Sequence, residues 1–494
     1  MPEGKAILAI DQGTTSTRSL MFGGAGTLLH TAQKEFTQSY PQPGFVEHDP
    51  RTIFNDVLQT ARDVIARTPV PIAAIGIANQ RETTVIWDRA DGTPVHPAIV
   101  WQDRRTATDC ERLRQEGVEP LIRDRTGLVI DPYFSATKIA WILDHVSGAR
   151  TRAERGELAF GTIDSFLLWH LTGGAVHATD AANASRTMLF NIHRQCWDSD
   201  LLKLFDIPAA LLPTVRDNSF LFGLTATGLF DRQIPIAGMA GDQHAALIGQ
   251  ACFAAGAAKA TYGTGCFLLL NTGDAAVPPP KGLLTTMAYR LGGRATYAIE
   301  GSIFAAGATL KWLRDRLRLF GDVTHTSAIA ASLADTGGVY FVPAFAGLGA
   351  PYWDAEARGL ICGLTLDSKP EHIIRAALES AAYQTLDLLA AMGEKESPRA
   401  LRIDGGMAAN DWFCQFLADI VRAPVERPLV LEATAQGAAY LAGLTIGMFS
   451  GPSAVSAAWR PEARFEGRMD AAARERLIKG WKSAIARALR GENI

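Results

Sequence analysis

The chain carries two copies of one local pattern: an apolar run, a short turn rich in glycine and threonine, and a second apolar run. The first copy spans residues 6–22 and turns at 12–17, and the second spans 257–270 and turns at 263–265. Each copy predicts two strands joined by a tight turn whose amides and hydroxyls could bind an anion. Two such turns facing each other would hold a polyphosphate from both sides. Only the first copy contains a carboxylate, Asp11, so the repeat predicts a metal-bound nucleotide in a cleft between two related halves.

Composition excludes several classes of protein. At 494 residues the chain is long enough for at least two domains, and 48% hydrophobic with 20% charged residues is typical of a globular protein. A net charge of −3 offers no basic surface for a nucleic acid. The six cysteines form no C-x-x-C pair, which argues against a disulfide framework or a zinc site. We expect a cytoplasmic protein without stable membrane insertion, because no signal core and no apolar stretch of about 20 residues stands out.

Short apolar runs alternate with longer helical patterns, which is typical of an α/β fold. The candidate strands are residues 73–78, 84–87, 99–101, 236–240, 295–299, 339–342 and 401–403. The candidate helices are one that starts at Pro50 with Asp49 as its N-cap, residues 371–392, residues 434–445 and an amphipathic segment near the C-terminus. The repeat places a boundary near 245–256. We therefore expect domains at 1–248 and 249–494, with the last helix packing back.

Two polar segments that follow predicted strands are candidates for substrate chemistry. Asp242, between Gly241 and Gln243, could accept a proton from a hydroxyl group. Taken alone, it is better explained as the N-cap of a helix at 245–251. Arg81 and Glu82 are adjacent opposite charges, which are usually solvated. They could instead bind several hydroxyls of one small polyol as donor and acceptor.

Other candidate residues are open to a structural or a functional interpretation. Trp101 and Tyr133 could belong to the core or could line a pocket, and Phe267 is most simply a core residue. Asp11 could hold Mg²⁺ beside the nucleotide phosphates or could cap its own turn. The Gly-Gly pair at 405–406 could admit a nucleoside against bare backbone, although most such pairs are simple turns.

Two longer segments resemble signatures of the FGGY family of carbohydrate kinases. They are residues 133–145 and residues 359–364 followed by 372–379. Further similarity lies in residues 11–18, 43–50, 79–84, 126–135, 183–193 and 343–354. The resemblance covers nearly the whole chain from residue 7 to about 447, and it is closest to the members that phosphorylate glycerol.

The resemblance implies two ribonuclease-H-like domains of the actin-like ATPase type, with the nucleotide and the substrate in the cleft between them. It implies in-line transfer of the γ-phosphoryl group of Mg-ATP to glycerol, which gives sn-glycerol 3-phosphate as the first step of glycerol catabolism. It also implies a homo-oligomer, either a dimer or a tetramer.

The resemblance assigns roles to residues at matching positions. Asp242 is implied as the general base, and Asp11 as the residue that serves the Mg²⁺. The implied substrate-binding residues are Arg81, Glu82, Trp101, Tyr133, Asp242, Gln243 and Phe267. The implied nucleotide-binding residues are Thr14, Thr15, Ser16, Arg18, Thr264, Gly307, Lys311, Gly406 and Asn410. Lys311 stands where the family often has glutamine, so the chain departs from the pattern at that contact.

Two other functions are compatible with parts of the pattern. The first is an FGGY kinase that acts on a pentulose or on gluconate; Arg81 and Glu82 together with Trp101 favour a three-carbon substrate instead. The second is a non-catalytic nucleotide switch, such as an actin-like filament protein or a chaperone ATPase. Such a switch needs no base for a small-molecule hydroxyl, so Asp242 argues against it.

Overall fold

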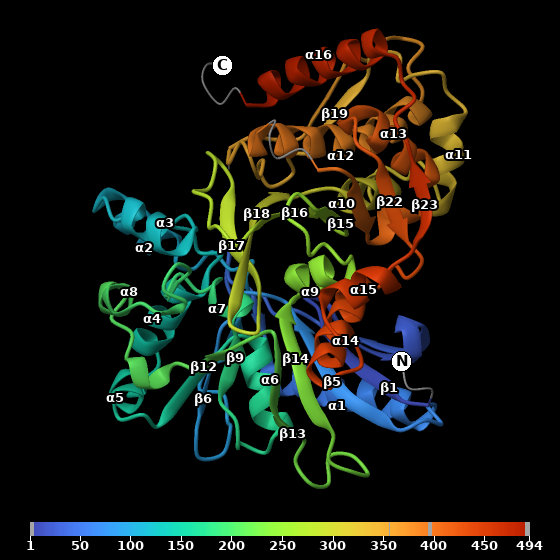
Figure 1. Ribbon diagram of the computed structural model, residues 1–494. Coiled ribbons are helices and arrows are strands. Elements are labelled where there is room, and N and C mark those ends of the chain that lie inside the picture. Colours follow the sequence, from blue (N-terminus) through green and yellow to red (C-terminus); the bar gives the residue numbers. More distant parts are fainter. Residues whose placement is uncertain (1–3, 355, 394–397, 490–494) are drawn as a thin grey trace.

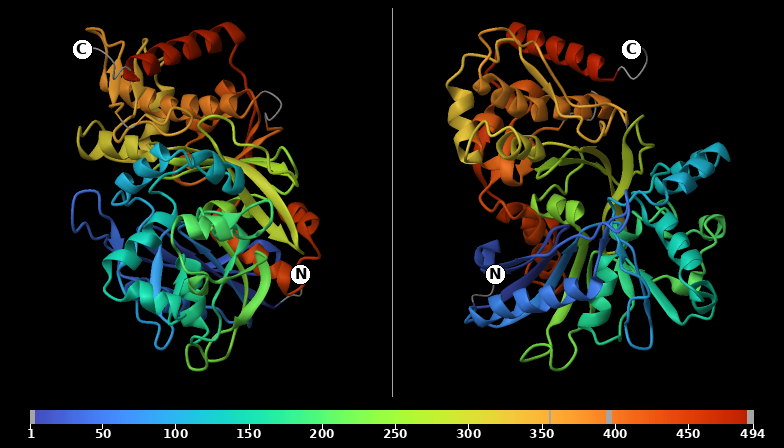
Figure 2. Two further views of the ribbon diagram at one scale, coloured as in Figure 1. Left: turned by 90° about the vertical axis from the view of Figure 1, so that its left-hand side faces the viewer. Right: turned by 180° about the vertical axis from the view of Figure 1, so that it is seen from behind.

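A computed structural model describes residues 4–354, 356–393 and 398–489. The chain forms two lobes, each built on a large β-sheet, and they lie one above the other in Figure 1. The side and back views of Figure 2 show helices in the space between the sheets and on the outer faces of both lobes. The ends of the predicted domains, residues 1–3 and 490–494, lie outside the described residues.

The two sheets have corresponding strand orders. The first contains, in spatial order, β13 (Ser219–Leu224), β14 (Pro235–Gly241), β5 (Ile72–Asn79), β1 (Ala6–Gln12), β2 (Ser16–Phe22) and β3 (Leu28–Glu35). The second contains β23 (Pro461–Phe465), β22 (Val425–Pro428), β21 (Leu401–Asp404), β15 (Ala258–Tyr262), β16 (Cys266–Gly273), β18 (Arg294–Ile303) and β17 (Leu284–Leu291). Strands β1, β5 and β14 run parallel, as do β15, β21 and β22. The order β3-β2-β1-β5-β14 thus matches β18-β16-β15-β21-β22, which is the duplicated ribonuclease-H-like architecture that the resemblance implied.

The repeated strand–turn–strand is present in both sheets. Strands β1 and β2 pair antiparallel, with Asp11 opposite Arg18, and β15 and β16 pair in the same way, with Tyr262 opposite Cys266. Both hairpins occupy the equivalent position in their sheets. The sequence repeat is therefore confirmed as a structural repeat.

The main helices agree with the predicted patterns. Beside the first sheet lie α1 (Pro50–Ala66), α6 (Ile163–Leu171) and α9 (Asp242–Gly249), and the second lobe contains α10 (Gly307–Asp315), α11 (Thr326–Ala331), α12 (Pro370–Met392), α13 (Asp411–Val421) and α16 (Ala471–Ala488). Asp49 caps α1, since its carboxylate accepts a hydrogen bond from the Arg51 amide at 3.0 Å. The side chains of Ile53, Val57 and Ala61 share the buried face of this helix, at the spacing that predicted it.

A group of smaller elements extends the first lobe at its side, left in Figure 1. It contains β6 (Val85–Asp88), β7 (Ala98–Ile99), β8 (Leu158–Gly161), α2 (Ala107–Gln115), α3 (Glu119–Thr126), α4 (Ser135–His145), α5 (Ala149–Glu154), α7 (Ala181–Ala184) and α8 (Ser199–Leu204). Strand β7 ends at Ile99, so the predicted strand 99–101 is shorter than expected and Trp101 lies in a turn. Trp101 therefore lies outside the strand, and its side chain is not constrained by strand pairing.

Helix α14 (Ala433–Thr445) joins the two lobes. It comes late in the sequence, yet it packs on β5 and β14 of the first sheet and on α9 (Figure 1). Glycines permit the approach: a Cβ added at Gly76 would lie 2.1 Å from the carbonyl oxygen of Ala438, and one added at Gly437 would lie 1.8 Å from that of Ala245. The absence of side chains at these glycines therefore lets the backbones come into direct contact. The domain division at residue 248 stays a prediction.

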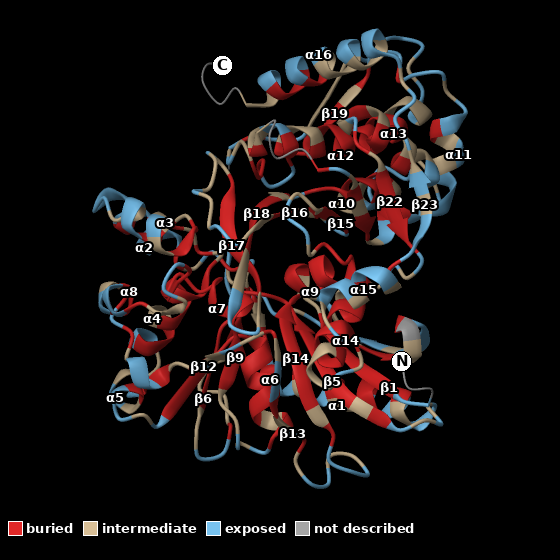
Figure 3. Cartoon of the chain, in the orientation of Figure 1, coloured by how far each residue is buried: buried red, intermediate tan, exposed pale blue. Residues whose placement is uncertain are grey.

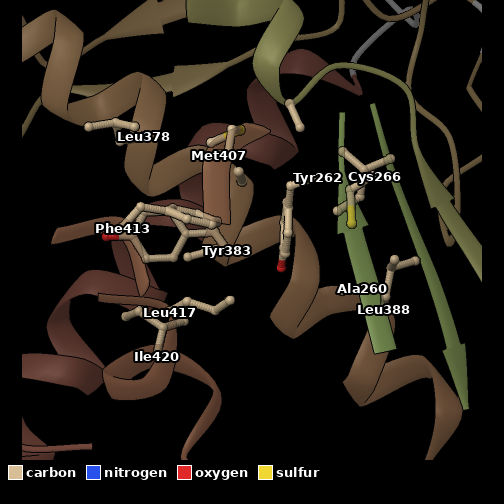
Figure 4. Close-up of a cluster of buried hydrophobic side chains, with 14 of the residues drawn as sticks. Ala260, Tyr262, Cys266, Leu378, Tyr383, Leu388, Met407, Phe413, Leu417 and Ile420 are labelled. Atoms are coloured by element: carbon tan, nitrogen blue, oxygen red, sulfur yellow. The ribbon is translucent and has the colours of Figure 1, made fainter. Parts of the chain in front are cut away.

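The second lobe has its own aromatic core. Figure 4 shows Tyr262, Tyr383 and Phe413 among aliphatic side chains from β15, α12 and α13. Helix α16 joins this core through Trp481, which stacks on Tyr383 and donates a hydrogen bond to Asp387 at 2.7 Å. The last helix therefore packs on the second lobe, and its outer face is exposed (Figure 3). Within the described ranges no helix is long and apolar enough to cross a membrane.

The contact between α9 and α14 generates a first prediction. Gly437→Ala would force two helix backbones apart, so we expect the free energy of unfolding to fall by about 3 kcal/mol, at the upper end of the usual cost of overpacking. The measurement is urea unfolding followed by circular dichroism. Gly321→Ala is the matched control, because a Cβ there meets no atom within 4 Å. Equal stability of the two variants would show that the helices separate freely.

Candidate active site

Three chemically important segments meet because their strands are parallel neighbours. Asp11 lies near the end of β1, Arg81 and Glu82 follow β5, and Asp242 follows β14. The carboxyl ends of adjacent parallel strands share one edge of a sheet, and ligands of open α/β sheets bind there. Helix α9 starts at this edge and lies between the two lobes (Figure 1). The topology thus brings together residues that are far apart in the sequence.

Asp242 is the first residue of α9, and Gly241 occupies the N-cap. The interpretation of Asp242 as a cap for a helix at 245–251 is therefore wrong, because the helix begins three residues earlier. Its carboxylate accepts a hydrogen bond from the Gln243 amide at 2.7 Å and lies 3.3 Å from Nε of Arg81. Burial raises the pKa of Asp242, and the charge of Arg81 opposes this shift. The side chain keeps 29% of its surface exposed, so a ligand can reach it.

Arg81 is the centre of the predicted substrate group. Its Nη2 donates to the hydroxyl oxygen of Tyr133 at 3.5 Å, and its guanidinium carbon lies 5.4 Å from the ring centroid of Phe267. Its Nε lies 3.9 Å from a carboxylate oxygen of Glu82. Arg81 therefore contacts four of the residues predicted with it, including Asp242.

Trp101 completes this group and connects it to the first turn. Its ring packs edge-on against Tyr133, with 5.5 Å between centroids. Its indole N–H donates to the hydroxyl of Thr14 at 2.9 Å. Of the alternatives for Trp101, the structure supports a half-buried wall residue over a core residue.

The backbone at Glu82 is strained. Glu82 has a φ of 60°, and a hydrogen bond of 2.7 Å from the Thr83 amide to the Arg81 carbonyl closes a three-residue turn around it. Such a turn is rare for an L-residue and persists only where the surroundings hold it. Contacts around the turn include Ser135, whose hydroxyl donates to the Glu82 carbonyl at 3.1 Å, and Arg186, whose Nε donates to Glu82 Oε1 at 2.6 Å. Burial raises the pKa of Glu82, while Arg81 and Arg186 oppose the shift.

Sequence reasoning missed three charged residues of this site. Glu300 of β18 pairs with Arg81 at 2.5 Å and with Arg186 at 2.8 Å, and Lys259 of β15 donates to Gln243 at 2.5 Å. All three charges are buried. Lys259 is the one charged residue of β15, and Glu300 follows the apolar pair Ala298-Ile299 in β18; a buried charge requires a partner. A charged residue within an apolar strand can be recognised in the sequence, although the sequence does not identify its partner.

The second turn borders a cavity of about 550 Å³. Its lining residues are Gly263, Thr264, Gly307, Ala308, Lys311, Trp312, Asp315 and Arg316. The amide of Gly307 donates to the carbonyl of Gly263 at 3.0 Å, and a Cβ on Gly307 would lie 2.6 Å from that oxygen. Three residues predicted for the nucleotide, Thr264, Gly307 and Lys311, therefore lie together around a space large enough for a cofactor-sized ligand.

Gly406 and Asn410 are outside the lining of this cavity. Gly406 is exposed and starts the short turn after β21, and a Cβ there would meet no atom within 4 Å. Asn410 caps α13 by accepting from the Phe413 amide at 3.0 Å, and it donates to the Thr326 hydroxyl at 3.1 Å. The turn is nevertheless adjacent to the cavity, since Met407 lies 3.9 Å from the Cβ position of Gly307.

The first turn is closed by a hydrogen bond of 2.9 Å from the Gly13 amide to the Ser16 carbonyl, and Thr15 at its tip is exposed. Arg18, predicted to contact phosphate, donates to Asp11 at 2.6 Å and to Glu432 of the second half at 2.5 Å. Burial raises the pKa of Asp11, and Arg18 opposes the shift. In this structure Arg18 therefore bridges two carboxylates.

A second cavity, of about 280 Å³, lies between α1 and α6 and is lined by residues such as Arg51, Asp91 and His170. None of the predicted site residues lines it. It contributes nothing to the group around Arg81.

Comparison with known proteins identifies the family. Residues 6–249 match the N-terminal domain, and residues 258–446 the C-terminal domain, of the FGGY family of carbohydrate kinases. The chain belongs to this family. The predicted resemblance is confirmed, and with it the two-domain α/β fold.

The most similar FGGY proteins found carry one name. The glycerol kinase of Gluconobacter oxydans is 59% identical over 493 residues, which is 99% of this chain and 96% of that protein. The glycerol kinase of Rhodospirillum centenum is 56% identical over 99% of both chains. Among solved structures, that of Plasmodium falciparum glycerol kinase with ADP has a TM-score of 0.92 and 36% identity, with 99% of each chain covered.

Proposed function

We propose that the protein is an ATP-dependent kinase that phosphorylates glycerol at a terminal hydroxyl, giving sn-glycerol 3-phosphate and ADP. The observation that carries this proposal is the 3.3 Å contact between Asp242 and Arg81, which sets a carboxylate beside an Arg-Glu pair suited to a small polyol. Eight relatives that are 53–59% identical to this chain are named glycerol kinase, which supports the same substrate.

Asp242 would act as the general base. In the proposed step, the terminal hydroxyl of glycerol donates a hydrogen bond to the Asp242 carboxylate, and its oxygen attacks the γ-phosphorus of ATP. The bond from that phosphorus to the bridging oxygen of ADP breaks as the new bond forms, and the hydroxyl proton passes to Asp242. Phosphoryl transfer needs mainly positioning and charge stabilisation, so one carboxylate base is sufficient protein chemistry.

Substrate recognition would depend on the group around Arg81. Arg81 supplies donors and Glu82 an acceptor for neighbouring hydroxyls, and Gln243, held by Lys259, offers an amide. Tyr133 contributes a hydroxyl, while the rings of Trp101 and Phe267 suit the carbon chain. A site that hydrogen-bonds each hydroxyl rejects a deoxy analogue by roughly 10⁴ or more, because its buried polar groups are then left unpaired.

The nucleotide would lie between the two turns. Thr264, Gly307 and Lys311 line the 550 Å³ cavity in the second lobe, and Gly406 and Asn410 belong to the turn next to it. Thr14, Thr15, Ser16 and Arg18 would approach the phosphates from the first lobe. Arg18 would then exchange at least part of its contact with Asp11 or Glu432 for phosphate.

Asp11 is better suited to a metal ion that binds together with the nucleotide than to one held by protein residues alone. Within the described ranges, no group of three or more His, Cys, Asp or Glu residues could hold a metal ion alone. Mg²⁺ typically takes one or two carboxylates and completes its shell with phosphate oxygens and water. We therefore propose that Asp11 holds the Mg²⁺ of Mg-ATP, whose charge stabilises the transferring phosphoryl group when bound.

The proposal includes three further features that the resemblance implies. They are domains at 1–248 and 249–494, a cytoplasmic location and a dimer or tetramer. The matches to the two family domains, which end at 249 and start at 258, support the division.

The substrate assignment is tested with a panel of acceptors. Purified protein with Mg-ATP is given glycerol, dihydroxyacetone, xylulose, ribulose or gluconate, and ADP release is followed. We expect the highest kcat/KM with glycerol, because Arg81, Glu82 and the two aromatic walls suit a three-carbon triol. Equal or better turnover of a pentulose or gluconate would overturn the glycerol assignment and favour another FGGY activity.

Asp242→Asn tests the base. We expect kcat to fall by about 10²–10⁴, the usual contribution of a general base, while the dissociation constant of ADP stays within about 2-fold. Asp231→Asn, an exposed aspartate in the loop before β14, is the control and should keep the wild-type rate. A D242N enzyme with near-normal kcat would remove Asp242 from this role.

The pH dependence follows from the raised pKa of Asp242. The base works as the carboxylate, so kcat/KM should fall as the pH decreases through that pKa. The midpoint of this acid limb should lie above 3.8, the ordinary pKa of an aspartate. Initial rates are measured across the pH range in which circular dichroism shows the protein folded. A rate that stays constant down to pH values near 4 would contradict the assignment.

A further inference from the structure

Four buried charged side chains form a closed network next to the proposed substrate site. Arg81 Nη1 and Nη2 donate to Glu300 at 2.5 and 3.3 Å, and Arg186 Nη2 donates to the same carboxylate at 2.8 Å. Arg186 Nε donates to Glu82 at 2.6 Å. Each of the four side chains is at most 2% exposed. Two guanidinium groups and two carboxylates thus compensate one another away from water.

The network crosses between the two halves of the chain. Arg81, Glu82 and Arg186 belong to the first half, whereas Glu300 lies on β18 of the second sheet. Although burial alone would raise it, Arg186 and Arg81 hold the pKa of Glu300 at about 2. Glu300 is therefore an anion at neutral pH, and it pairs directly with Arg81, which is proposed to bind the polyol.

Stability alone is a poor explanation for such a network. Removing four charges from water is costly, and buried ion pairs can often be replaced by apolar side chains with no loss of stability. This network also leaves one donor unused, since Nη1 of Arg186 is buried and has no hydrogen-bond partner among the described residues. Its benefit is positional: the guanidinium of Arg81 is planar and is held by two parallel contacts to one carboxylate, which defines its orientation.

Two consequences follow for the substrate group. With Glu300 on one side of its guanidinium, Arg81 keeps its Nε towards Asp242 and its Nη2 towards Tyr133. Through Arg186, the same carboxylate supports the strained turn that presents Glu82. Glu300 thus reaches both members of the proposed polyol-binding pair without being near the end of β5 in sequence.

We propose that Glu300 is a positioning residue for polyol binding, which orients Arg81 directly and Glu82 through Arg186. The inference rests on the proposed function and extends it, because it makes the orientation of the Arg81–Glu82 pair dependent on a carboxylate from the second lobe. Glu300 would touch neither substrate nor the transferred group.

The test compares Glu300→Gln with a matched buried glutamate. Glu379 is 1% exposed, lies in the second half, pairs with Arg375 at 2.9 Å and accepts from Tyr383 at 2.9 Å. For Glu300→Gln we expect the glycerol KM to rise about 30-fold, the lower range for losing one partner of a buried charge pair, while the ATP KM changes less than about 3-fold. Glu379→Gln should leave both KM values within about 2-fold.

A pH profile separates positioning from a general loss of structure. Without the charge of Glu300, Arg81 acts more strongly on Asp242 at 3.3 Å, so the acid limb of kcat/KM should move to lower pH in Glu300→Gln. Lys259 and Asp11, which also influence Asp242, are unchanged in this variant. If Glu300 had a purely structural role, Glu300→Gln would reduce the rate equally at every pH. That result would overturn the proposal.

Two further measurements complete the test: a double-mutant cycle with Arg81, and a substitution of Glu300 by the shorter aspartate. If Glu300 acts through Arg81, the effects of Glu300→Gln and Arg81→Lys on kcat/KM will be strongly non-additive, and additive effects would reject the proposal. If Glu300→Gln does not fold, Glu300→Asp keeps the charge but withdraws it, and an unchanged glycerol KM in that variant would also reject it. Wild-type turnover is measured first. A preference for another polyol would refute the glycerol assignment alone, and the Glu300 comparison would then be made with that polyol.

Discussion

The arrangement of the site depends on one requirement: the guanidinium of Arg81 is buried and must be surrounded by carboxylates. An unpaired charge in this position would be strongly destabilising, so three acids converge on it from different parts of the chain. Glu82 follows it directly, Asp242 comes from the next parallel strand, and Glu300 comes from the opposite lobe. Compensating this one cation therefore brings the proposed base next to the proposed polyol-binding pair. It also links the two lobes, through the ion pairs of Arg81 and Arg186 with Glu300.

The two lobes also meet at a second contact, where glycines let the backbones of a helix and a sheet pack directly against each other. Helix α14 belongs to the second half of the sequence but lies on the first sheet, where Gly76 and Gly238 leave room for its backbone. On its other side Gly437 meets α9, the helix that begins with Asp242. A rigid contact between backbones keeps the start of α9 in place, which matters because a general base must lie within hydrogen-bond distance of its substrate.

Much of the fold could be predicted from the sequence, because its signals are local. The repeated hairpin, the Asp49 cap and the spacing of apolar residues in α1 each involve a few neighbouring residues. The resemblance placed Arg81 and Asp242 in one substrate site, and the parallel strands β5 and β14 bring them together. The contacts of Glu300 could not be foreseen, since its partners lie 219 and 114 residues away and no local pattern encodes them. The exact start of α9 was missed for a related reason, because Gly241 and Asp242 are both acceptable N-cap residues and only tertiary context selects between them.

The duplicated hairpin has acquired different surroundings in the two lobes. In the first, the turn is crowded: Thr14 accepts from Trp101, and Arg18 lies between Asp11 and Glu432. In the second, Gly263 and Thr264 border an open cavity. The hydrogen bond from Trp101 connects this turn to the wall of the proposed polyol group, so a ligand that displaces Thr14 also disturbs Trp101. After the open turn, β16 carries Phe267, whose ring centroid lies 5.4 Å from the guanidinium carbon of Arg81. Trp101 packs on Tyr133, whose hydroxyl accepts from Arg81, so the first hairpin connects to this guanidinium through two aromatic side chains and the second through the ring of Phe267.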